Sequence, residues 1–192
     1  MRYYLSLGSN LGEETRNLAR ARSLIERSGI QIVRSSSLYS TQPVGMSDQP
    51  WFANQVIEIA TALRPPGLLR LLKKVEKTLG RRPGPINGPR LIDIDILLAG
   101  DLVLTEKDLV IPHPRLQHRN FILVPLKEIA PEAVHPVTKT TVLDLFKTSR
   151  DPAIVRKLRP RRDELRRAGR GTAKLNFNKG CADGQTYKEE KG

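Results

Sequence analysis

Cysteine is nearly absent from this chain, and it contains no long hydrophobic run. Cys181 is the single cysteine among 192 residues, which excludes an internal disulfide framework and a zinc site made of several cysteines. No apolar stretch approaches the roughly 20 residues of a membrane-spanning helix, and residues 1–5 lead into a strand pattern rather than a signal peptide. We therefore expect a cytoplasmic protein without a membrane partner.

Acidic residues are also few relative to basic ones, and the excess of basic residues is unevenly distributed along the chain. Residues 1–149 contain 20 Lys and Arg against 14 Asp and Glu, whereas residues 150–192 contain 13 against 6. We therefore divide the chain into a domain over residues 1–149 and a basic C-terminal extension over residues 150–192, which we expect to be flexible toward its end. A solvated tail and a contact with nucleic acid or another anionic surface both remain open for the extension.

Hydrophobic periodicity predicts alternating strands and helices over the domain. Apolar residues recur with period two in the predicted strands and with helical spacing in the predicted helices. The predicted order is strand, helix, strand, strand, helix, strand, over residues 3–7, 13–27, 30–39, 52–60, 68–79 and 91–98, with a hairpin return over residues 101–105.

Two aspartates stand on the predicted strand over residues 91–98. Residues two apart on a strand point to the same face, so Asp93 and Asp95 lie side by side while the isoleucines around them face the other way. Adjacent carboxylates repel each other unless a cation lies between them, and Mg2+ commonly binds through one or two carboxylates while water and phosphate complete its shell. Arg90, directly before the strand, would reach the phosphate oxygens. The alternative is an edge strand with a solvated acidic face.

The segment before this strand, residues 80–90, is the least regular part of the domain. It contains three prolines, three glycines and three arginines, which exclude a helix or a sheet interior. We expect a mobile basic loop that closes over the site, since such loops are common in phosphoryl transfer. An ordinary solvated loop is the alternative.

Two further residues are open to a structural or a functional interpretation. Glu76 lies on or beside the apolar face of its predicted helix, either as a flank residue that reaches water or as the partner of a basic group near the site. His113 is held between two prolines. With Arg115 and Arg119 nearby, it would supply cationic or hydrogen-bonding contacts to phosphate.

Four separated motifs carry a resemblance to a known family. They are LGSNLG (residues 7–12), TQPVG with DQPWFAN (residues 41–54), GPRLIDIDILL (residues 88–98) and IPHPR with RNF (residues 111–121). In this order they resemble the motifs of 6-hydroxymethyl-7,8-dihydropterin pyrophosphokinase, an enzyme of folate biosynthesis. The resemblance covers roughly residues 1–148 and implies a ferredoxin-like α+β core, with helices packed on an antiparallel sheet. The predicted order of elements agrees with it, and residues 125–146 are similar to the family's closing helix and hairpin.

The resemblance implies a reaction and a set of site residues. The chain would transfer a pyrophosphoryl group from ATP to the hydroxymethyl oxygen of the pterin and release AMP, with two Mg2+ ions on Asp93 and Asp95 that bridge the triphosphate. Phe52 and Phe121 would sandwich the pterin ring. The matched residues are Arg81, Arg90, Asp93 and Asp95 for catalysis, Glu76, His113, Arg115 and Arg119 for ATP, and Thr41, Gln42, Pro43, Val44, Phe52, Asn54 and Phe121 for the pterin.

The sequence also departs from the family's pattern. Asn87 stands where a tryptophan is often found, Pro83 where a second arginine is common, and Leu91 where threonine is usual. These departures concern how the loop closes more than the reaction itself. Phe52 replaces a frequent tyrosine, which removes a hydroxyl and keeps the stacking face. We expect a monomer that acts on small molecules.

Two other functions compete with this interpretation. Ferredoxin-like folds often bind RNA, but aromatic residues make up only 5% of the chain and none forms the pattern that RNA-binding modules place on their central strands. Such a module would also have no need of two carboxylates facing a pair of arginines. A metal-dependent phosphotransferase with another acceptor is the second alternative, and only residues 41–54 and Phe121 argue against it.

Overall fold

The computed structural model of the chain describes residues 1–85 and 87–159. Most of the predicted basic extension, residues 160–192, lies outside the described residues. The elements are β1 (Arg2–Ser9), α1 (Glu14–Arg27), β2 (Gln31–Ser35), β3 (Tyr39–Thr41), β4 (Phe52–Ala60), α2 (Pro65–Thr78), β5 (Asp93–Leu98), β6 (Leu104–Glu106), β7 (Leu109–Ile111), the 3-10 turn η1 (Leu116–His118), α3 (Asn120–Ile129), α4 (Val142–Thr148) and β8 (Val155–Lys157). No helix in these ranges is long and apolar enough to cross a membrane.

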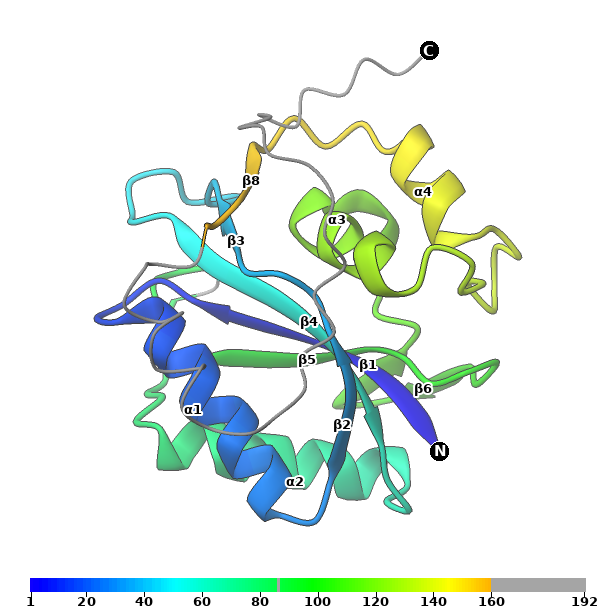
Figure 1. The fold of residues 1–192 in the computed structure, drawn as a ribbon, viewed down its shortest axis with the longest axis horizontal. Helices are drawn as coiled ribbons and strands as arrows, with labels where there is room; N and C mark the ends of the chain where they lie inside the picture. Colours follow the sequence, from blue (N-terminus) through cyan, green and yellow to red (C-terminus); the bar gives the residue numbers. More distant parts are fainter. Residues whose placement is uncertain (86, 160–192) are drawn as a thin grey trace.

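Within the described residues, the main sheet has six antiparallel strands (Figure 1). β1 lies between β5 and β4, and the far edge of β4 is shared by β2 and β3. The core order β5-β1-β4-β2, with α1 and α2 as the two crossover helices, is the split β-α-β arrangement of ferredoxin-like folds. The predicted α+β fold with helices on an antiparallel sheet is confirmed.

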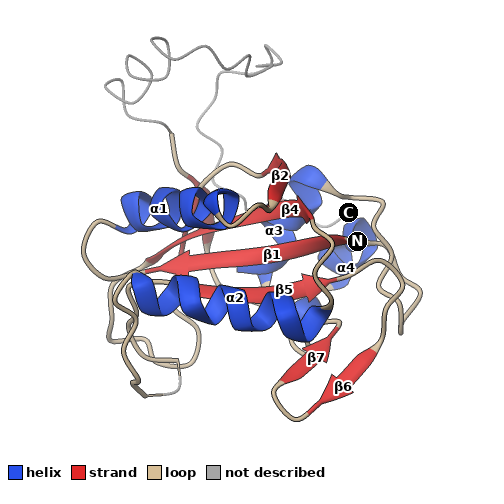
Figure 2. Cartoon of the chain, turned by 90° about the horizontal axis from the view of Figure 1, so that it is seen from below, coloured by secondary structure: helices blue, strands red, loops and turns tan. Residues whose placement is uncertain are grey.

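The two faces of the sheet carry different helices. α1 and α2 cover one face, and α3 and α4 lie behind the other (Figure 2). Alternate residues of β1, β4 and β5, among them Leu5, Ile57 and Ile94, pack under α1 and α2 in the larger apolar core. A second cluster, which includes Val56 and Leu123, joins the opposite face to α3 and α4. Each strand therefore contributes to both cores by simple alternation.

Several element boundaries differ from the sequence prediction. Helix α2 begins at Pro65 rather than at residue 68, because proline lacks only an N–H that the first turn of a helix leaves unbonded. The strand predicted over residues 30–39 is divided into β2 and β3. β5 begins at Asp93 instead of residue 91. The hairpin return predicted over residues 101–105 is wrong, because β6 pairs with β7 in a separate two-stranded sheet and not with β5.

The chain after α3 also differs from its predicted form. Where a closing helix and hairpin are predicted, helices α3 and α4 are joined by a loop that makes one isolated bridge, between Val134 and Thr141. Residues 155–157 then form β8, which pairs with β3 at the edge of the main sheet. The domain boundary between residues 149 and 150 stays a prediction. The first part of the extension, however, pairs with the main sheet through β8.

Candidate active site

The candidate site lies on the α3 side of the sheet, near one end of its central strands. Gly8 on β1 is opposite Asp93 on β5 and Asn54 on β4, and Ser6 is opposite Asp95. Because these residues alternate with the apolar ones, their side chains share one face. A Cβ atom at Gly8 would lie 2.8 Å from Oδ1 of Asn54, so glycine allows the strands to carry a polar cavity at this point.

Two adjoining cavities open on this face. The first, which we call the aromatic cavity, is lined by Ser6, Gly8, Thr41, Gln42, Val44, Phe52, Asn54, Asn87, Arg90, Asp93, Asp95, Arg119 and Phe121. The second, which we call the basic cavity, is lined by Lys73, Arg81, Arg82, Gly84, Pro85, Asn87, Gly88, Pro89, Arg90, Asp93, Asp95, His113, Arg115 and Arg119. Both aspartates and two arginines line both cavities, so the cavities meet over the Asp pair.

The two aspartates have opposite electrostatic surroundings. Asp93 contacts Arg81 and forms an ion pair of 2.6 Å with Arg90. Burial opposes the ionisation of Asp93, but the charges of the two arginines outweigh it and lower its pKa. Burial and the neighbouring charge of Asp93 instead raise the pKa of Asp95 to about 6. No hydrogen bond or ion pair joins Asp95 to another residue within the described ranges.

The residues present fit a magnesium site. Asp95 is a partly buried carboxylate, and none of the described cationic side chains forms an ion pair with it. An ion beside it would relieve the repulsion from Asp93. The described residues contain no cluster of three or more His, Cys, Asp or Glu side chains that could hold a metal by themselves. A site with two carboxylates suits Mg2+, which takes its remaining ligands from water and substrate phosphates.

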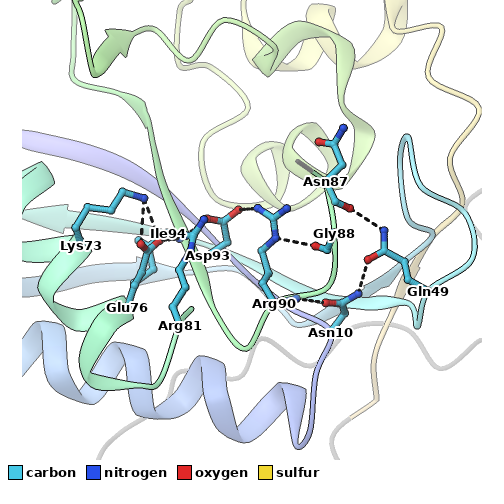
Figure 3. A network of polar contacts seen from close by, with 10 residues as sticks. All are labelled: Asn10, Gln49, Lys73, Glu76, Arg81, Asn87, Gly88, Arg90, Asp93 and Ile94. Carbon is cyan, nitrogen blue, oxygen red and sulfur yellow. Dashed lines mark hydrogen bonds and ion pairs between the residues drawn. The ribbon is translucent and has the colours of Figure 1, made fainter. Parts of the chain in front are cut away.

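Glu76 lies beneath the Asp pair and is 2% exposed. Its carboxylate contacts Lys73 at 3.0 Å and Arg81 at 2.5 Å, and it accepts a hydrogen bond of 2.7 Å from the backbone N–H of Ile94 (Figure 3). Of the two sequence interpretations, the structure therefore shows the pairing with a basic group. Glu76 lines neither cavity, so it contacts the site through Arg81 and the backbone between the two aspartates.

A hydrogen-bond network joins three loops on the other side of Arg90. Oδ1 of Asn10 accepts from the backbone N–H of Arg90 at 2.8 Å, and Nδ2 of Asn10 donates to Gln49 at 2.9 Å. Gln49 in turn donates to the backbone carbonyl of Asn87 at 2.8 Å (Figure 3). Asn87 has a φ of 59°, a conformation that asparagine tolerates better than tryptophan. The residue that departs from the family's pattern is therefore suited to the turn it occupies.

His113 and Arg119 occupy the wall of the basic cavity. Burial and the positive charges of Arg119 and Arg115 lower the pKa of His113 to about 4, so the imidazole is neutral at pH 7. The backbone N–H of Arg115 donates to Nδ1 at 3.2 Å, which leaves the ring hydrogen on Nε2. His113 can therefore donate a hydrogen bond from Nε2, and both contacts predicted for it, cationic and hydrogen-bonding, stay predictions.

The aromatic cavity has two rings on separate elements. Phe52 begins β4 and Phe121 lies in the first turn of α3, where the guanidinium of Arg119 is 5.3 Å from its ring centre. Between them, Nδ2 of Asn54 donates to Oγ1 of Thr41 at 2.6 Å. Both rings line one cavity together with the polar side chains of Asn54 and Thr41, a combination that suits a planar heterocycle.

Comparison with known proteins decides the family. A family model described as 7,8-dihydro-6-hydroxymethylpterin-pyrophosphokinase (HPPK) matches residues 4–131. The chain belongs to this family.

Two relatives illustrate the range of HPPK chains. The 2-amino-4-hydroxy-6-hydroxymethyldihydropteridine pyrophosphokinase of Methylorubrum extorquens is 44% identical over 134 residues, which are 69% of this chain and 85% of the relative. The folic acid synthesis protein fol1 of Pneumocystis carinii is 41% identical over 143 residues, 74% of this chain but only 19% of the relative. This chain thus spans about a fifth of the length of such longer relatives.

The fold comparison agrees with the family. A crystal structure of wild-type Plasmodium falciparum HPPK-DHPS superposes with a TM-score of 0.59 at 20% identity, and the match covers 76% of this chain and 43% of that one. The chain therefore has the ferredoxin-like α+β fold of HPPK domains.

The structure gathers most of the HPPK site residues predicted from the sequence. The aromatic cavity contains all the predicted pterin residues except Pro43, and the basic cavity contains all the predicted phosphate residues except Glu76. The N–H of Gln42 already donates to the carbonyl of Ile154 at 3.0 Å, so this N–H is not free to donate to a pterin. Their roles toward substrates stay predictions.

Sequence reasoning did not select several residues that the structure brings to the site. Lys73 and Arg82 line the basic cavity, while Asn10 and Gln49 form the network around Arg90. Lys73 could have been found from its position three residues before Glu76 on a helix, which places both on one face. Asn10 and Gln49 belong to recognised motifs, but no periodicity indicates that they meet.

Proposed function

We propose that this chain transfers a pyrophosphoryl group from ATP to the hydroxymethyl group of 6-hydroxymethyl-7,8-dihydropterin and releases AMP. The observation that carries the proposal is the junction of the two cavities over Asp93 and Asp95. One cavity suits a planar ring and the other suits a chain of phosphates. A donor and an acceptor bound in them would place their reacting groups at the same pair of carboxylates.

The pterin is proposed to occupy the aromatic cavity. Phe52 and Phe121 would contact its two faces, and aromatic pairs of this kind gain energy beyond the area that they bury. The amide of Asn54 is held by Thr41 through its nitrogen, so its oxygen is left to accept from a ring N–H. A ligand without these polar groups would leave the buried polar groups of the cavity unpaired, so it would bind more weakly.

The triphosphate is proposed to occupy the basic cavity. Lys73, Arg81, Arg82, Arg90, Arg115 and Arg119 give that cavity six cationic side chains beside the two aspartates. Such a surface concentrates polyanions, and planar guanidinium groups pair with phosphate oxygens in a bidentate manner. His113, neutral and with its hydrogen on Nε2, would donate one more hydrogen bond to phosphate.

Mg2+, when bound through Asp93 and Asp95, would neutralise charge on the phosphates as it develops; we propose two such ions. Arg81 and Arg90 now contact Asp93, and their remaining N–H groups would hold the transferred group in place. Glu76 fixes Arg81 and the backbone at Ile94, while Asn10 fixes the backbone at Arg90. Positioning of this kind provides much of the rate enhancement in phosphoryl transfer.

Release of AMP tests the proposal directly. The purified chain is incubated with ATP and Mg2+, with and without 6-hydroxymethyl-7,8-dihydropterin, and AMP is separated from ADP. We expect AMP only when the pterin is present. AMP formation without the pterin, or ADP as the product, would contradict the reaction.

A binding titration distinguishes the remaining alternative. If a folded protein forms no AMP, the pterin is titrated in the absence of ATP. Failure to bind the pterin would favour a metal-dependent phosphotransferase with another acceptor. We further propose that the enzyme works as a monomer on these small molecules in the cytoplasm.

A further inference from the structure

Residues 151–157 follow α4 and lie outside residues 4–131, which the family model matches. They run from the first turn of α3 to the edge strand β3 and contact both sides of the aromatic cavity. We call this segment the C-terminal brace. Figure 1 shows β8, its last part, beside β3 and above α3.

The first contact of the brace is with the N-terminus of α3. Oδ2 of Asp151 accepts from the backbone N–H of Asn120 at 2.7 Å, and the Asp151 carbonyl accepts from the Asn120 side chain at 2.8 Å. No side chain of the residue before the helix caps it, so a carboxylate from the brace satisfies an otherwise free N–H and meets the positive end of the helix dipole. Asn120 stands between Arg119 and Phe121, which both line the aromatic cavity.

The second contact is with the opposite wall of the cavity. The Ile154 carbonyl accepts from the N–H of Gln42 at 3.0 Å, and Val155 is opposite Thr41 in the pairing of β8 with β3. The guanidinium of Arg156 lies 5.2 Å from the ring centre of Trp51. Trp51 directly precedes Phe52, so the brace contacts the chain on both sides of residues 43–50.

The third contact ties these two walls together. Lys157 on β8 forms an ion pair of 2.9 Å with Glu128 on α3. Glu128 also accepts hydrogen bonds from the N–H and hydroxyl of Ser37 and from the hydroxyl of Tyr39. Val155, 3% exposed, packs with Tyr39 and Val124 of α3. The brace thus holds α3 against the β3 edge at two places.

We propose that the C-terminal brace sets the spacing of the two aromatic walls, and that Asp151 and Arg156 are positioning residues for the pterin. This inference rests on the proposed function. Asp151 acts through Asn120 on the wall that carries Phe121, and Arg156 acts through Trp51 on the wall that carries Phe52. None of the described residues that line the basic cavity forms a hydrogen bond or ion pair with the brace, although Arg119, next to Asn120, lines both cavities, so the effect is directed mainly to the pterin.

The test uses Asp151→Ala and Arg156→Ala in the full chain. The dissociation constants of the pterin and of ATP are measured separately, together with kcat and each KM. Asp151→Ala removes the cap that holds the start of α3, and Arg156→Ala removes the cation–ring contact with Trp51, so each variant should loosen one wall of the aromatic cavity. We expect the pterin dissociation constant to rise about tenfold for Asp151→Ala and about threefold for Arg156→Ala. The ATP dissociation constant should change less than twofold for Arg156→Ala and should rise by a clearly smaller factor than that of the pterin for Asp151→Ala, because Arg119 lines both cavities. Trp51 is the only tryptophan of the chain, so its emission should also shift in Arg156→Ala.

Three control variants separate positioning from charge and stability. Glu132→Ala and Arg150→Ala remove an acid and a base from exposed positions and should leave the pterin affinity unchanged. Ile25→Val lowers stability from the opposite face of the sheet, where Ile25 is fully buried under the strands. We expect it to lower the melting temperature without changing the ratio of pterin to ATP affinity.

The outcomes distinguish the brace from the proposed function. If the wild type forms AMP with the pterin but both brace variants bind the pterin as the wild type does, the brace proposal is wrong. It is equally wrong if the two affinities fall together, as general destabilisation would cause. If the wild type neither binds the pterin nor forms AMP, the proposed function fails, and the brace proposal fails with it.

Discussion

The two faces of the central strands serve opposite purposes. Toward α1 and α2, β1 and β5 present Leu5, Ile94 and Ile96, all almost completely buried. Toward the site, the same strands present Ser6 and Gly8 with the two aspartates. One face is a close-packed apolar core, and the other holds like charges side by side. Stability and chemistry are therefore divided between alternate residues of one strand.

The two faces contribute to the stability of the fold with opposite signs. Each fully buried apolar side chain stabilises the fold by about 1.5–3 kcal/mol. On the site face, burial and the charge of Asp93 raise the pKa of Asp95 to about 6, which means that ionised Asp95 destabilises the ligand-free protein. We therefore expect substitutions on the site face to lower activity and substitutions on the face toward α1 and α2 to lower stability. Four changes test this.

Asp95→Asn should give the largest effect. Loss of one carboxylate from the Asp pair removes a ligand of the proposed metal, so we expect kcat to fall by at least about a thousandfold. AMP release at saturating ATP, Mg2+ and pterin measures the loss. A folded Asp95→Asn enzyme with near-normal turnover would contradict the metal assignment.

The same variant should be more stable than the wild type when no ligand is bound. Since the folded pKa of Asp95 is raised from 3.8 to about 6, the protonated form is favoured by folding, and this contribution is lost as the pH rises through about 6. Asp95→Asn mimics the protonated form, so its advantage should be about 1–3 kcal/mol at pH 7 and vanish near pH 4. Urea unfolding at the two pH values measures it. A constant difference would show that the charge of Asp95 is not the cause.

Ile94→Ala tests the opposite face between the same two aspartates. The side chain is 1% exposed in the larger apolar core, so truncation should lower the free energy of unfolding by about 2–5 kcal/mol. The backbone N–H that donates to Glu76 is kept, so the folded fraction should retain most of its kcat. Chemical denaturation and the rate per folded molecule are compared. A loss of rate as large as that of Asp95→Asn would contradict the division of stability and chemistry between the two faces.

Phe121→Leu probes the ring on α3. Leucine keeps an apolar side chain but loses the flat face, so the pterin KM should rise about tenfold while the ATP KM changes little. Initial rates with each substrate varied in turn provide both constants. An equal rise in the two constants would place the pterin elsewhere.

Phe52→Tyr should have the smallest effect. It adds the hydroxyl that the family often has and keeps the ring, so pterin affinity should change less than about threefold. Direct titration of the pterin measures the change. A tenfold change in either direction would show that this position determines specificity through its polar edge and not through stacking.

The sequence allows the central part of the site to be predicted because it depends on local alternation. Period two places Asp93 and Asp95 on one face, and the structure confirms that Ile94 faces the other way. The order of elements follows from the same periodicities. Helix α2 begins earlier than predicted, because Pro65 and Pro66 form its first turn, where proline is tolerated.

Contacts between distant segments could not be predicted in the same way. Nothing in the local sequence indicates that Arg81 and Arg90 meet on Asp93, because a loop without period has no preferred face. The meeting of Asn10 with Gln49 depends on three loops at once. Asp151 lies in the segment that composition alone separates from the domain as a basic extension. Its role depends on the tertiary fold that brings it to α3.

The pairing of β8 with β3 has a consequence for the order in which the enzyme is made. Val155 can pair with Thr41 only after nearly all of the described chain has been synthesised, because synthesis proceeds from the N-terminus. By then β5 can already lie beside β1, with both aspartates in place. The pairs between β5 and β1 that place the two aspartates therefore need no residue beyond Leu98, whereas the β3 edge of the aromatic cavity is complete only once residues 155–157 are present.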